Sequence, residues 1–330
     1  MGLVCRCFLF NAVLLAFSGF SLQAQQVSND SLQHRLYDLT PDHYYAYAKP
    51  RFWQKIKYIP ADIYAFGKFT IQKENLVLDA AVIGSTALLL PFDQQIQDES
   101  QRFGDRLGGW DEDHAYSKFL GLNIVPQNIN SAVYYVGNGG TTILLSGMFY
   151  TISLLDPEDY RARHTSSELI ECLIATGIAT QTIKRITGRQ SPVRANPQGN
   201  DGGAWHFFPS FSDYQRDTPN YDAMPSGHLA TYVAALMVIA INYPEITWIK
   251  PVGYTLGALL ALNMVSTKVH WISDYPLGIL TGYVIGKTIA ERRITKISKN
   301  GIGAQPTTFK WNYSMSRLAS TSVFGASVTF

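Results

Sequence analysis

A series of long apolar segments constrains the fold of this chain more than any other feature. They lie at residues 76–91, 141–155, 167–183, 229–243, 252–267 and 277–290. The stretches LATYVAALMVIAINY and GYTLGALLALNMV are rich in Ala, Leu and Met, and apolar and polar residues do not alternate in them. Segments of this kind are longer than a typical strand and favour helix. The sequence therefore predicts a mainly α protein.

The length of these segments leaves two arrangements open. Each is shorter than the ~20 residues that span a bilayer, so they are either core helices of a bundle or thin, tilted membrane spans. Charged residues make up 16% of the chain, against ~25% in an average soluble domain. The net charge is only +2, and no cluster of Lys and Arg suggests a groove for a polyanion. We therefore expect no nucleic-acid partner.

The first 24 residues have the layout of a secretory signal peptide. An apolar core at residues 8–17 is followed by a break at Ser18 and Gly19, and cleavage is predicted after Ala24. The alternative is an uncleaved membrane anchor. Cleavage would leave Cys172 as the only cysteine, so no internal disulfide is predicted. We expect an exported, membrane-associated protein with its site facing the periplasm.

The chain divides into four predicted parts. They are a signal peptide at 1–24, an amphipathic and first helical region at 25–139, a helical core at 140–295 and a tail at 296–330. The aromatic and basic stretch KPRFWQKIKYIPADIYAFGKF is either a packing element or a lipid-interface segment. The tail sequence FKWNYSMSRLASTSVFGASVTF predicts two strands. Two strands cannot close a membrane barrel, which favours a packed hairpin.

Polar residues punctuate the apolar segments around a long predicted loop at 188–225. Before this loop, Lys184 and Arg185 close a helix that is predicted to begin near Ser166, and Gly188 ends it. Cations and Gly are also ordinary capping residues at a helix C-terminus. This group alone therefore does not establish a site.

The tetrapeptide PSGH forms the second polar group. Ser226 is a good N-cap, and Gly227 exposes its amide without a Cβ in the way. A helix start of this kind is a ready anion site. His228 is badly placed there as a cation, because the helix dipole disfavours its charged form unless an anion is bound. The alternative is a histidine that is merely packed at a helix start.

The sequence KVHWISDYPLG forms the third group. His270 and Asp274 are four residues apart, so the carboxylate could hold the ring Nδ1–H and present Nε2 outward. Asp274 could also be an N-cap, with Pro276 in the first turn of the next helix. The two readings are compatible. An imidazole oriented by a carboxylate is prepared as a nucleophile or base.

These three groups, in this order and beside apolar helices, resemble the signature blocks of the type 2 phosphatidic acid phosphatase and haloperoxidase superfamily. The resemblance covers roughly residues 140 to 290. It implies an antiparallel helix bundle with a possible short C-terminal β-hairpin, and hydrolysis of a phosphate monoester without a metal or cofactor. The residues it assigns are His270 as nucleophile, Asp274 as its orienting group, His228 as acid, and Lys184, Ser226 and Gly227 as phosphate ligands.

Two positions depart from the family pattern. Ser191 stands where the family has an Arg before its Pro, and Asn263 and Met264 stand where it has Ser-Arg. Each lost donor typically costs ~2–4 kcal/mol of transition-state stabilisation. Arg189 is therefore predicted to bind phosphate in their place, with Lys268 as the other candidate. The expected function is a phosphatase acting outside the cytoplasm on a phosphorylated lipid or another monoester. The alternatives are a catalytically silent envelope protein and a vanadate-dependent haloperoxidase.

Overall fold

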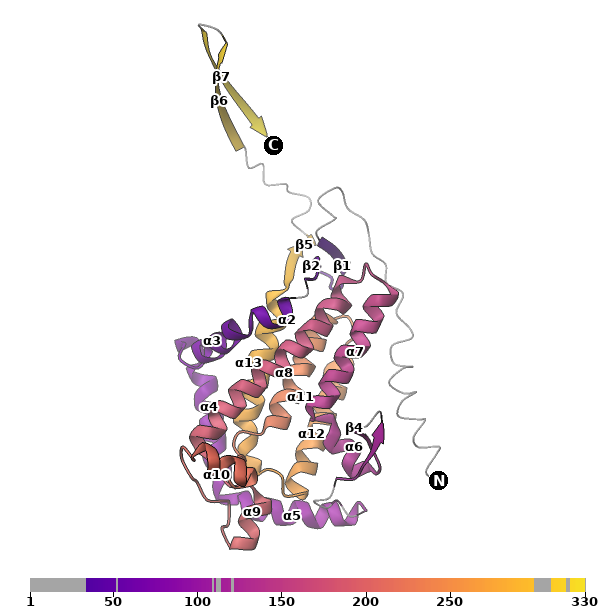
Figure 1. Cartoon of the computed structure of the whole chain (residues 1–330), viewed down its shortest axis with the longest axis vertical. Helices are drawn as coiled ribbons and strands as arrows, with labels where there is room; N and C mark the ends of the chain where they lie inside the picture. Colours follow the sequence, from indigo (N-terminus) through magenta and orange to yellow (C-terminus); the bar gives the residue numbers. More distant parts are fainter. Residues whose placement is uncertain are drawn as a thin grey trace.

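The structure, a computed structural model, describes residues 34–51, 53–108, 110, 114–119, 122–299, 310–318 and 321–329. The predicted signal peptide at 1–24 lies outside these residues. Long helices packed side by side form the body of the molecule (Figure 1). They are α7 (Gly139–Leu155), α8 (Tyr160–Thr187), α11 (Gly227–Asn242), α12 (Ile249–Ser266) and α13 (Tyr275–Arg292). The prediction of a mainly α bundle is confirmed.

Helix α8 begins earlier than the sequence indicated. The side chain of Asp159 caps it by accepting a hydrogen bond from the backbone of Ala162 at 3.0 Å, which adds nearly two turns before Ser166. Its C-terminus is as predicted, because Gly188 adopts the left-handed conformation with φ of 52° and its amide donates to the Lys184 carbonyl. Glycine reaches this conformation at no steric cost. The chain leaves α8 sharply at this point.

The N-terminal region contributes further helices around the bundle. They are α2 (Gln54–Lys57), α3 (Ile59–Phe69), α4 (Leu76–Leu89), α5 (Asp93–Arg106) and α6 (Ile129–Val136). A single turn of 3₁₀-helix at Leu90–Phe92, with Pro91 inside it, separates α4 from α5. Figure 1 shows the result, because α4 runs along the bundle whereas α5 crosses its end. This turn carries the polar helix α5 beneath the helices that form the site.

The long segment 188–225 is not entirely loop. It contains the short helices α9 (Pro192–Ala195) and α10 (Phe211–Arg216). Pro192 takes the first position of α9, where its missing N–H costs nothing. Ser210 caps α10 by accepting from the Asp213 amide at 3.1 Å. Proline and serine thus start short helices here, where composition had favoured loop.

In the part of the chain that the structure describes, strands occur as three small antiparallel sheets. The first has the order β1 (His34–Asp38), β2 (His43–Ala48) and β5 (Ile294–Ser298), the second pairs β3 (Tyr116–Phe119) with β4 (Leu122–Pro126), and the third pairs β6 (Lys310–Leu318) with β7 (Thr321–Thr329). The last pair confirms the C-terminal hairpin. Strand β2 pairs with β5, so the predicted N-terminal region and the end of the predicted core meet in one sheet.

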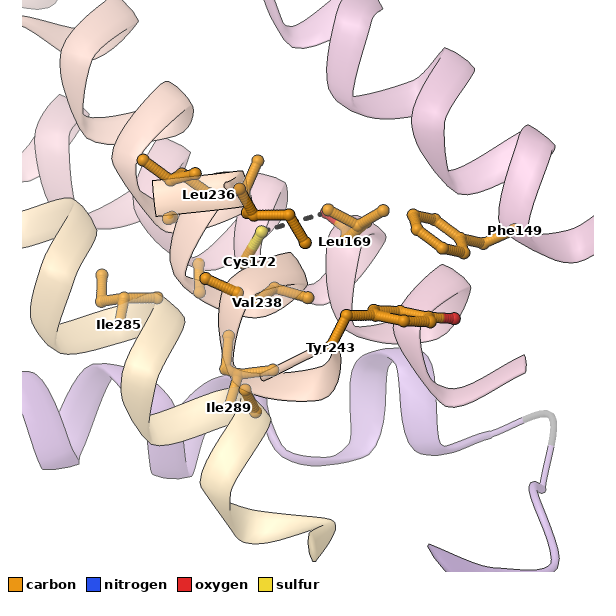
Figure 2. Close-up of a cluster of buried hydrophobic side chains, with 14 of the residues drawn as sticks. Phe149, Leu169, Cys172, Leu236, Val238, Tyr243, Ile285 and Ile289 are labelled. Atoms are coloured by element: carbon orange, nitrogen blue, oxygen red, sulfur yellow. Dashed lines mark hydrogen bonds between the residues drawn. The ribbon is translucent and has the colours of Figure 1, made fainter. Parts of the chain in front are cut away.

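The hydrophobic core lies between α7, α8, α11 and α13. Figure 2 shows Phe149 from α7, Leu169 and Cys172 from α8, and Ile285 and Ile289 from α13 meeting side chains of α11. The Cys172 thiol is buried and unoxidised, and it donates to the Leu169 carbonyl at 3.2 Å. This core holds the helices so that four of their termini meet at one end.

Close approach of α11 and α13 depends on a stripe of glycines. A Cβ added at Gly278 would lie 2.6 Å from the Ser226 carbonyl oxygen, and one at Gly286 would lie 2.5 Å from that of Ala234. Between them, Gly282 faces the Ala230 carbonyl equally closely. Backbone therefore packs on backbone along the two helices, and Gly278 places the start of α13 against Ser226.

Candidate active site

The three polar groups of the sequence meet at one end of the bundle. The end of α8 supplies Lys184, the start of α11 supplies Ser226, Gly227 and His228, and the turn between α12 and α13 supplies His270 and Asp274. A backbone hydrogen bond joins two of these groups, since the Ser226 amide donates to the Asp274 carbonyl at 3.1 Å. Segments that are distant in the sequence thus form one site.

The start of α11 is built as an anion site. Ser226 is its N-cap, and the Ser226 hydroxyl accepts from the Leu229 amide at 3.4 Å. A Cβ on Gly227 would lie 3.8 Å from Lys184 Nζ, so the ammonium lies over the exposed helix start. The positive end of the α11 dipole, the amides at the helix start and the Lys184 ammonium therefore all face the same volume. The Lys184 ammonium also faces the half-buried Asp222 carboxylate, 3.4 Å away.

His228 is electrically neutral at neutral pH in this arrangement. Its ring is half-buried, with its centroid 6.0 Å from that of His270 and 4.6 Å from that of Tyr134. Burial, together with the neighbouring His270 and Lys184, lowers the pKa of His228 to about 3. A bound anion would oppose this shift. Proton gain at His228 is therefore coupled to anion binding.

His270 and Asp274 lie together as their spacing predicted. His270 Nδ1 is 3.6 Å from Asp274 Oδ2, slightly beyond hydrogen-bond distance, and both side chains are buried. Burial opposes ionisation of Asp274, but Arg189 and His270 hold its pKa below the usual value. The carboxylate is therefore charged beside the imidazole. A small closure of the gap would let it accept the Nδ1–H and leave Nε2 as the nucleophilic atom.

The capping alternative for Asp274 is only partly realised. Asp274 occupies the N-cap position of α13, and Pro276 lies in the first turn, but the Asp274 side chain makes no hydrogen bond to an α13 amide. Its Oδ2 instead accepts from the Trp271 amide at 2.8 Å, across the 3₁₀ turn Ile272–Asp274. The carboxylate is thus directed back toward His270 and away from the helix it begins.

Arg189 does not point at the anion site in this structure. It is fully buried, and its Nη1 bonds to Asp274 Oδ1 and to the Ser273 hydroxyl, both at 2.6 Å. Its Nη2 bonds to Asp93 Oδ2 at 2.5 Å and to the Gly202 carbonyl at 2.7 Å. Both terminal nitrogens are therefore occupied behind Asp274. The predicted phosphate contact would require the guanidinium to leave two buried carboxylates.

The two positions that depart from the family pattern are buried as well. The Ser191 hydroxyl donates to the Pro219 carbonyl at 2.7 Å. Met264 is fully buried, and its sulfur is 4.0 Å from the Ser226 hydroxyl. Lys268, the other predicted substitute, is half-buried with φ of 57°, and its carbonyl accepts from the Val193 amide at 3.0 Å. Two guanidinium positions of the family are thus filled by packing groups here.

Sequence reasoning missed three side chains around the site. Asp93 lies behind it, and Tyr134 and His114 form a stack beside His228, with ring centroids of Tyr134 and His114 3.9 Å apart. Burial raises the pKa of Tyr134 to about 12, so its hydroxyl keeps its proton. No local pattern marks these residues. Only Asp93 lies near the end of a predicted helix, the segment 76–91.

Comparison with known proteins agrees with this geometry. Residues 166–296 match the family model of the PAP2 superfamily, and this range includes α8, the long segment 188–225, α11, α12 and α13. Comparisons with curated proteins and with solved structures returned no match. The matched range contains each of the sequence-predicted site residues. The match covers the helical core that carries this site, and it supports the resemblance to the type 2 phosphatidic acid phosphatase superfamily.

Proposed function

We propose that this protein is a phosphatase that hydrolyses a phosphate monoester through a phosphohistidine intermediate. The single observation that carries the proposal is the arrangement of two imidazoles, His228 and His270, beside an anion site made by the start of α11 and Lys184. The match of residues 166–296 to the PAP2 superfamily supports phosphatase activity in general. Phosphoryl transfer requires mainly positioning and electrostatic stabilisation, which this arrangement supplies.

In the proposed first step, the phosphoryl group lies over the Ser226 hydroxyl and the Gly227 amide, with Lys184 displaced from Asp222 toward the phosphoryl oxygens. His270 Nε2 forms a bond to phosphorus while the bond to the leaving oxygen breaks. His228 gives a proton to that oxygen. Because His228 is neutral in the empty site, this proton must arrive with the substrate monoanion or be taken up when the dianion binds.

In the second step, water attacks the phosphohistidine. His228, now without its proton, accepts one from the attacking water, the bond between phosphorus and Nε2 breaks, and inorganic phosphate leaves. Asp274 stabilises the cationic character that His270 acquires while it carries the phosphoryl group. The same histidine therefore serves as acid in one step and as base in the next.

A lipid-borne substrate is the second part of the proposal, supported by apolar side chains on the outer faces of the bundle. Several large apolar side chains on these faces have at least half of their surface exposed. They are Val77 and Ile83 of α4, Ile143, Leu144, Leu154 and Leu155 of α7, and Tyr254 of α12. Apolar surface of this extent marks an interaction site. Placement against a membrane would cover it.

The stretch Lys73–Arg106 is, among the described residues, long and apolar enough to cross a membrane by length and composition alone. Its apolar part, α4, has 14 residues, about 21 Å of helix against the ~30 Å of a hydrocarbon core. The chain then turns at Pro91 into polar α5. We therefore propose that α4 lies against lipid, and that the predicted signal peptide places the site on the periplasmic side.

Phosphate release from dioctanoyl phosphatidic acid by the purified protein tests the catalytic proposal. We expect wild type to release phosphate, and His270→Ala to abolish release while keeping the thermal unfolding midpoint within a few degrees. Acid-labile, base-stable labelling of wild type by ³²P-labelled substrate would identify the intermediate. A wild-type protein that binds phosphate or vanadate but releases no phosphate from any monoester would identify a catalytically silent member of the superfamily.

Cell fractionation tests the membrane proposal separately. We expect the mature chain in the membrane pellet after a high-salt wash, because apolar contacts are insensitive to salt. Val77→Glu combined with Ile83→Glu should release part of it, whereas Lys57→Glu with Lys68→Glu should not if apolar contact dominates. Recovery of wild type in the soluble fraction would contradict membrane association and leave the catalytic proposal intact.

A further inference from the structure

A buried ion cluster lies behind the His270–Asp274 pair and is not explained by phosphate binding. It consists of Asp93, Arg189, Ser273 and Asp274, and the two ion pairs that Arg189 makes with Asp93 and Asp274 are 0% exposed at every side chain. Burying three charges is costly unless each is paired and hydrogen-bonded. A cluster of this kind in direct contact with the Asp274 carboxylate therefore indicates a function in the site.

Asp93 satisfies both of its carboxylate oxygens within this cluster. Oδ1 accepts from the Ser273 amide at 3.0 Å, and Oδ2 accepts from the Ser273 hydroxyl at 2.6 Å and from Arg189 Nη2 at 2.5 Å. Ser273 stands between His270 and Asp274 in the chain. Asp93 thus binds the turn that carries His270 and Asp274, through the backbone amide and the side-chain hydroxyl of Ser273.

Arg189 also packs against aromatic rings. Its guanidinium carbon lies 5.0 Å from the centre of the Trp205 ring and 5.7 Å from that of Trp271. Trp271 is itself fully buried, and its indole Nε1–H donates to the Gln190 carbonyl at 2.8 Å. Aromatic packing and two carboxylates therefore fix Arg189 as a bridge between Asp93 and Asp274.

We propose that Asp93 is a positioning residue of the reaction, acting on His270 through Ser273, Arg189 and Asp274. This inference rests on the proposed function, and it extends the site beyond the matched range 166–296 to helix α5. Asp93 reaches the cluster because the chain turns at Pro91 and starts α5 beneath the α12–α13 turn.

The charge balance gives the proposal its chemical content. Arg189 alone would neutralise Asp274 and weaken the attraction between the Asp274 carboxylate and the His270 Nδ1–H. Burial raises the pKa of Asp93, and Arg189 and Ser273 oppose this shift. While Asp93 is ionised, one guanidinium is shared by two carboxylates, so the cluster keeps one net negative charge beside the imidazole. That charge favours the cationic character that His270 develops when Nε2 bonds to phosphorus.

Removal of the Asp93 charge is therefore expected to lower the basicity of His270. Two titratable side chains face His270, which are Asp274 on the same turn and His228 on α11. Lys184 and His114 act on His228 through their charges. Arg189 and Asp93 lie behind Asp274. Of these, Asp93→Asn changes only one, and the amide keeps nearly the same shape.

The first experiment measures steady-state hydrolysis of p-nitrophenyl phosphate by Asp93→Asn across pH 4 to 9. We expect kcat to fall about 10- to 100-fold with KM changed much less, because a reacting group is misplaced while phosphate binding persists. The acidic limb of the kcat/KM profile should move to lower pH by roughly half a unit. Glu171→Gln is the matched control, because Glu171 is also buried and paired with arginines, on α8 but 13 residues before Lys184. Its kcat and pH profile should equal those of wild type.

The second experiment does not depend on catalysis. Proton-coupled nitrogen NMR of ¹⁵N-histidine protein, with His270 assigned through His270→Gln, reports the Nδ1–H tautomer and its titration midpoint. We expect the midpoint of His270 to fall in Asp93→Asn by roughly half a pH unit. An inactive wild type with this NMR shift would refute the phosphatase proposal and keep Asp93 as a positioning residue.

A further variant covers the case in which Asp93→Asn does not fold. Ser273→Ala removes the hydrogen bonds that the hydroxyl makes with Asp93 and with Arg189 and leaves all charges, so kcat should fall severalfold with an unchanged pH profile. The inference is overturned if folded Asp93→Asn keeps the kcat and the His270 midpoint of wild type. It is equally overturned, where Asp93→Asn is unfolded, if Ser273→Ala keeps full kcat.

Discussion

Glu168 links the stability of the bundle to pH, and replacing it by glutamine should reveal this link. The side chain is fully buried on α8, and its Oε2 accepts from Asn242 Nδ2 at 2.5 Å. Burial raises the pKa of Glu168 from 4.5 to about 7, against the opposing effects of Arg293 and Asn242. The folded state therefore holds a proton at pH 6 that the unfolded chain has already released.

The sign of the effect follows from this difference. The folded pKa lies above the unfolded one, so Glu168 stabilises the fold fully below pH 4.5, and this contribution is lost as the pH rises through 7. Each pKa unit corresponds to ~1.4 kcal/mol. Between pH 5 and pH 8, the contribution of Glu168 to the free energy of unfolding should fall by about 2.5 kcal/mol.

Glu168→Gln removes the titrating proton and keeps an oxygen that can accept from Asn242. Denaturant unfolding of both proteins in detergent, followed by tryptophan fluorescence at several pH values, gives the difference in free energy of unfolding, in which groups common to both proteins largely cancel. We expect the variant to gain about 2.5 kcal/mol relative to wild type from pH 5 to pH 8. A difference that stays constant over this range would refute the assigned protonation of Glu168.

Three further outcomes follow from the site and from the packing of the bundle. His228→Ala should keep most activity on p-nitrophenyl phosphate but lose about 100-fold on an alkyl phosphate, whose leaving oxygen needs a proton; equal losses on both substrates would contradict its role as acid. Vanadate should inhibit more strongly as the pH falls from 8 to 6, because burial lowers the pKa of His228 to about 3 and anion binding must raise it. Calorimetry of vanadate binding in buffers of different ionisation enthalpy should show proton uptake, and His228→Ala should abolish this uptake. Gly282→Ala should lower the free energy of unfolding by about 1–3 kcal/mol, since its Cβ would meet the Ala230 carbonyl; Gly177→Ala, with no atom within 4 Å of the new Cβ, should not lower it.

The main helices were predictable because their determinants are local. Apolar length and residue type favoured helix, Ser226 was an N-cap candidate from its place before an apolar run, and Gly188 ended α8 through its left-handed conformation. The i, i+4 spacing of His270 and Asp274 likewise brings them together within one turn. Where local signals competed, the predictions were less accurate, as in the segment 188–225, where Pro192 and Ser210 start short helices.

The direction of Arg189 shows what the sequence alone could not determine. By sequence distance it lies near Lys184, and a phosphate contact was the natural prediction, but the guanidinium instead bonds to Asp93 and Asp274, 96 and 85 positions away. A long side chain next to a helix end can reach in several directions. Its partner is chosen by which buried charges the packing places within reach, and here burial leaves two carboxylates that require a cation.

The sequence by itself thus determined the helical character, the resemblance of the helical core to a known superfamily and the local chemistry of each site segment, because helix formation, capping and i, i+4 neighbours act over a few residues. Only the tertiary structure decided that α5 brings Asp93 beneath the His270 turn, that Tyr134 and His114 stack beside His228, and that Arg189 bridges two carboxylates. These contacts join elements far apart in the chain. The turn at Pro91 brings α5 to the site, and the glycine stripe of α13 lets α13 pack closely against α11.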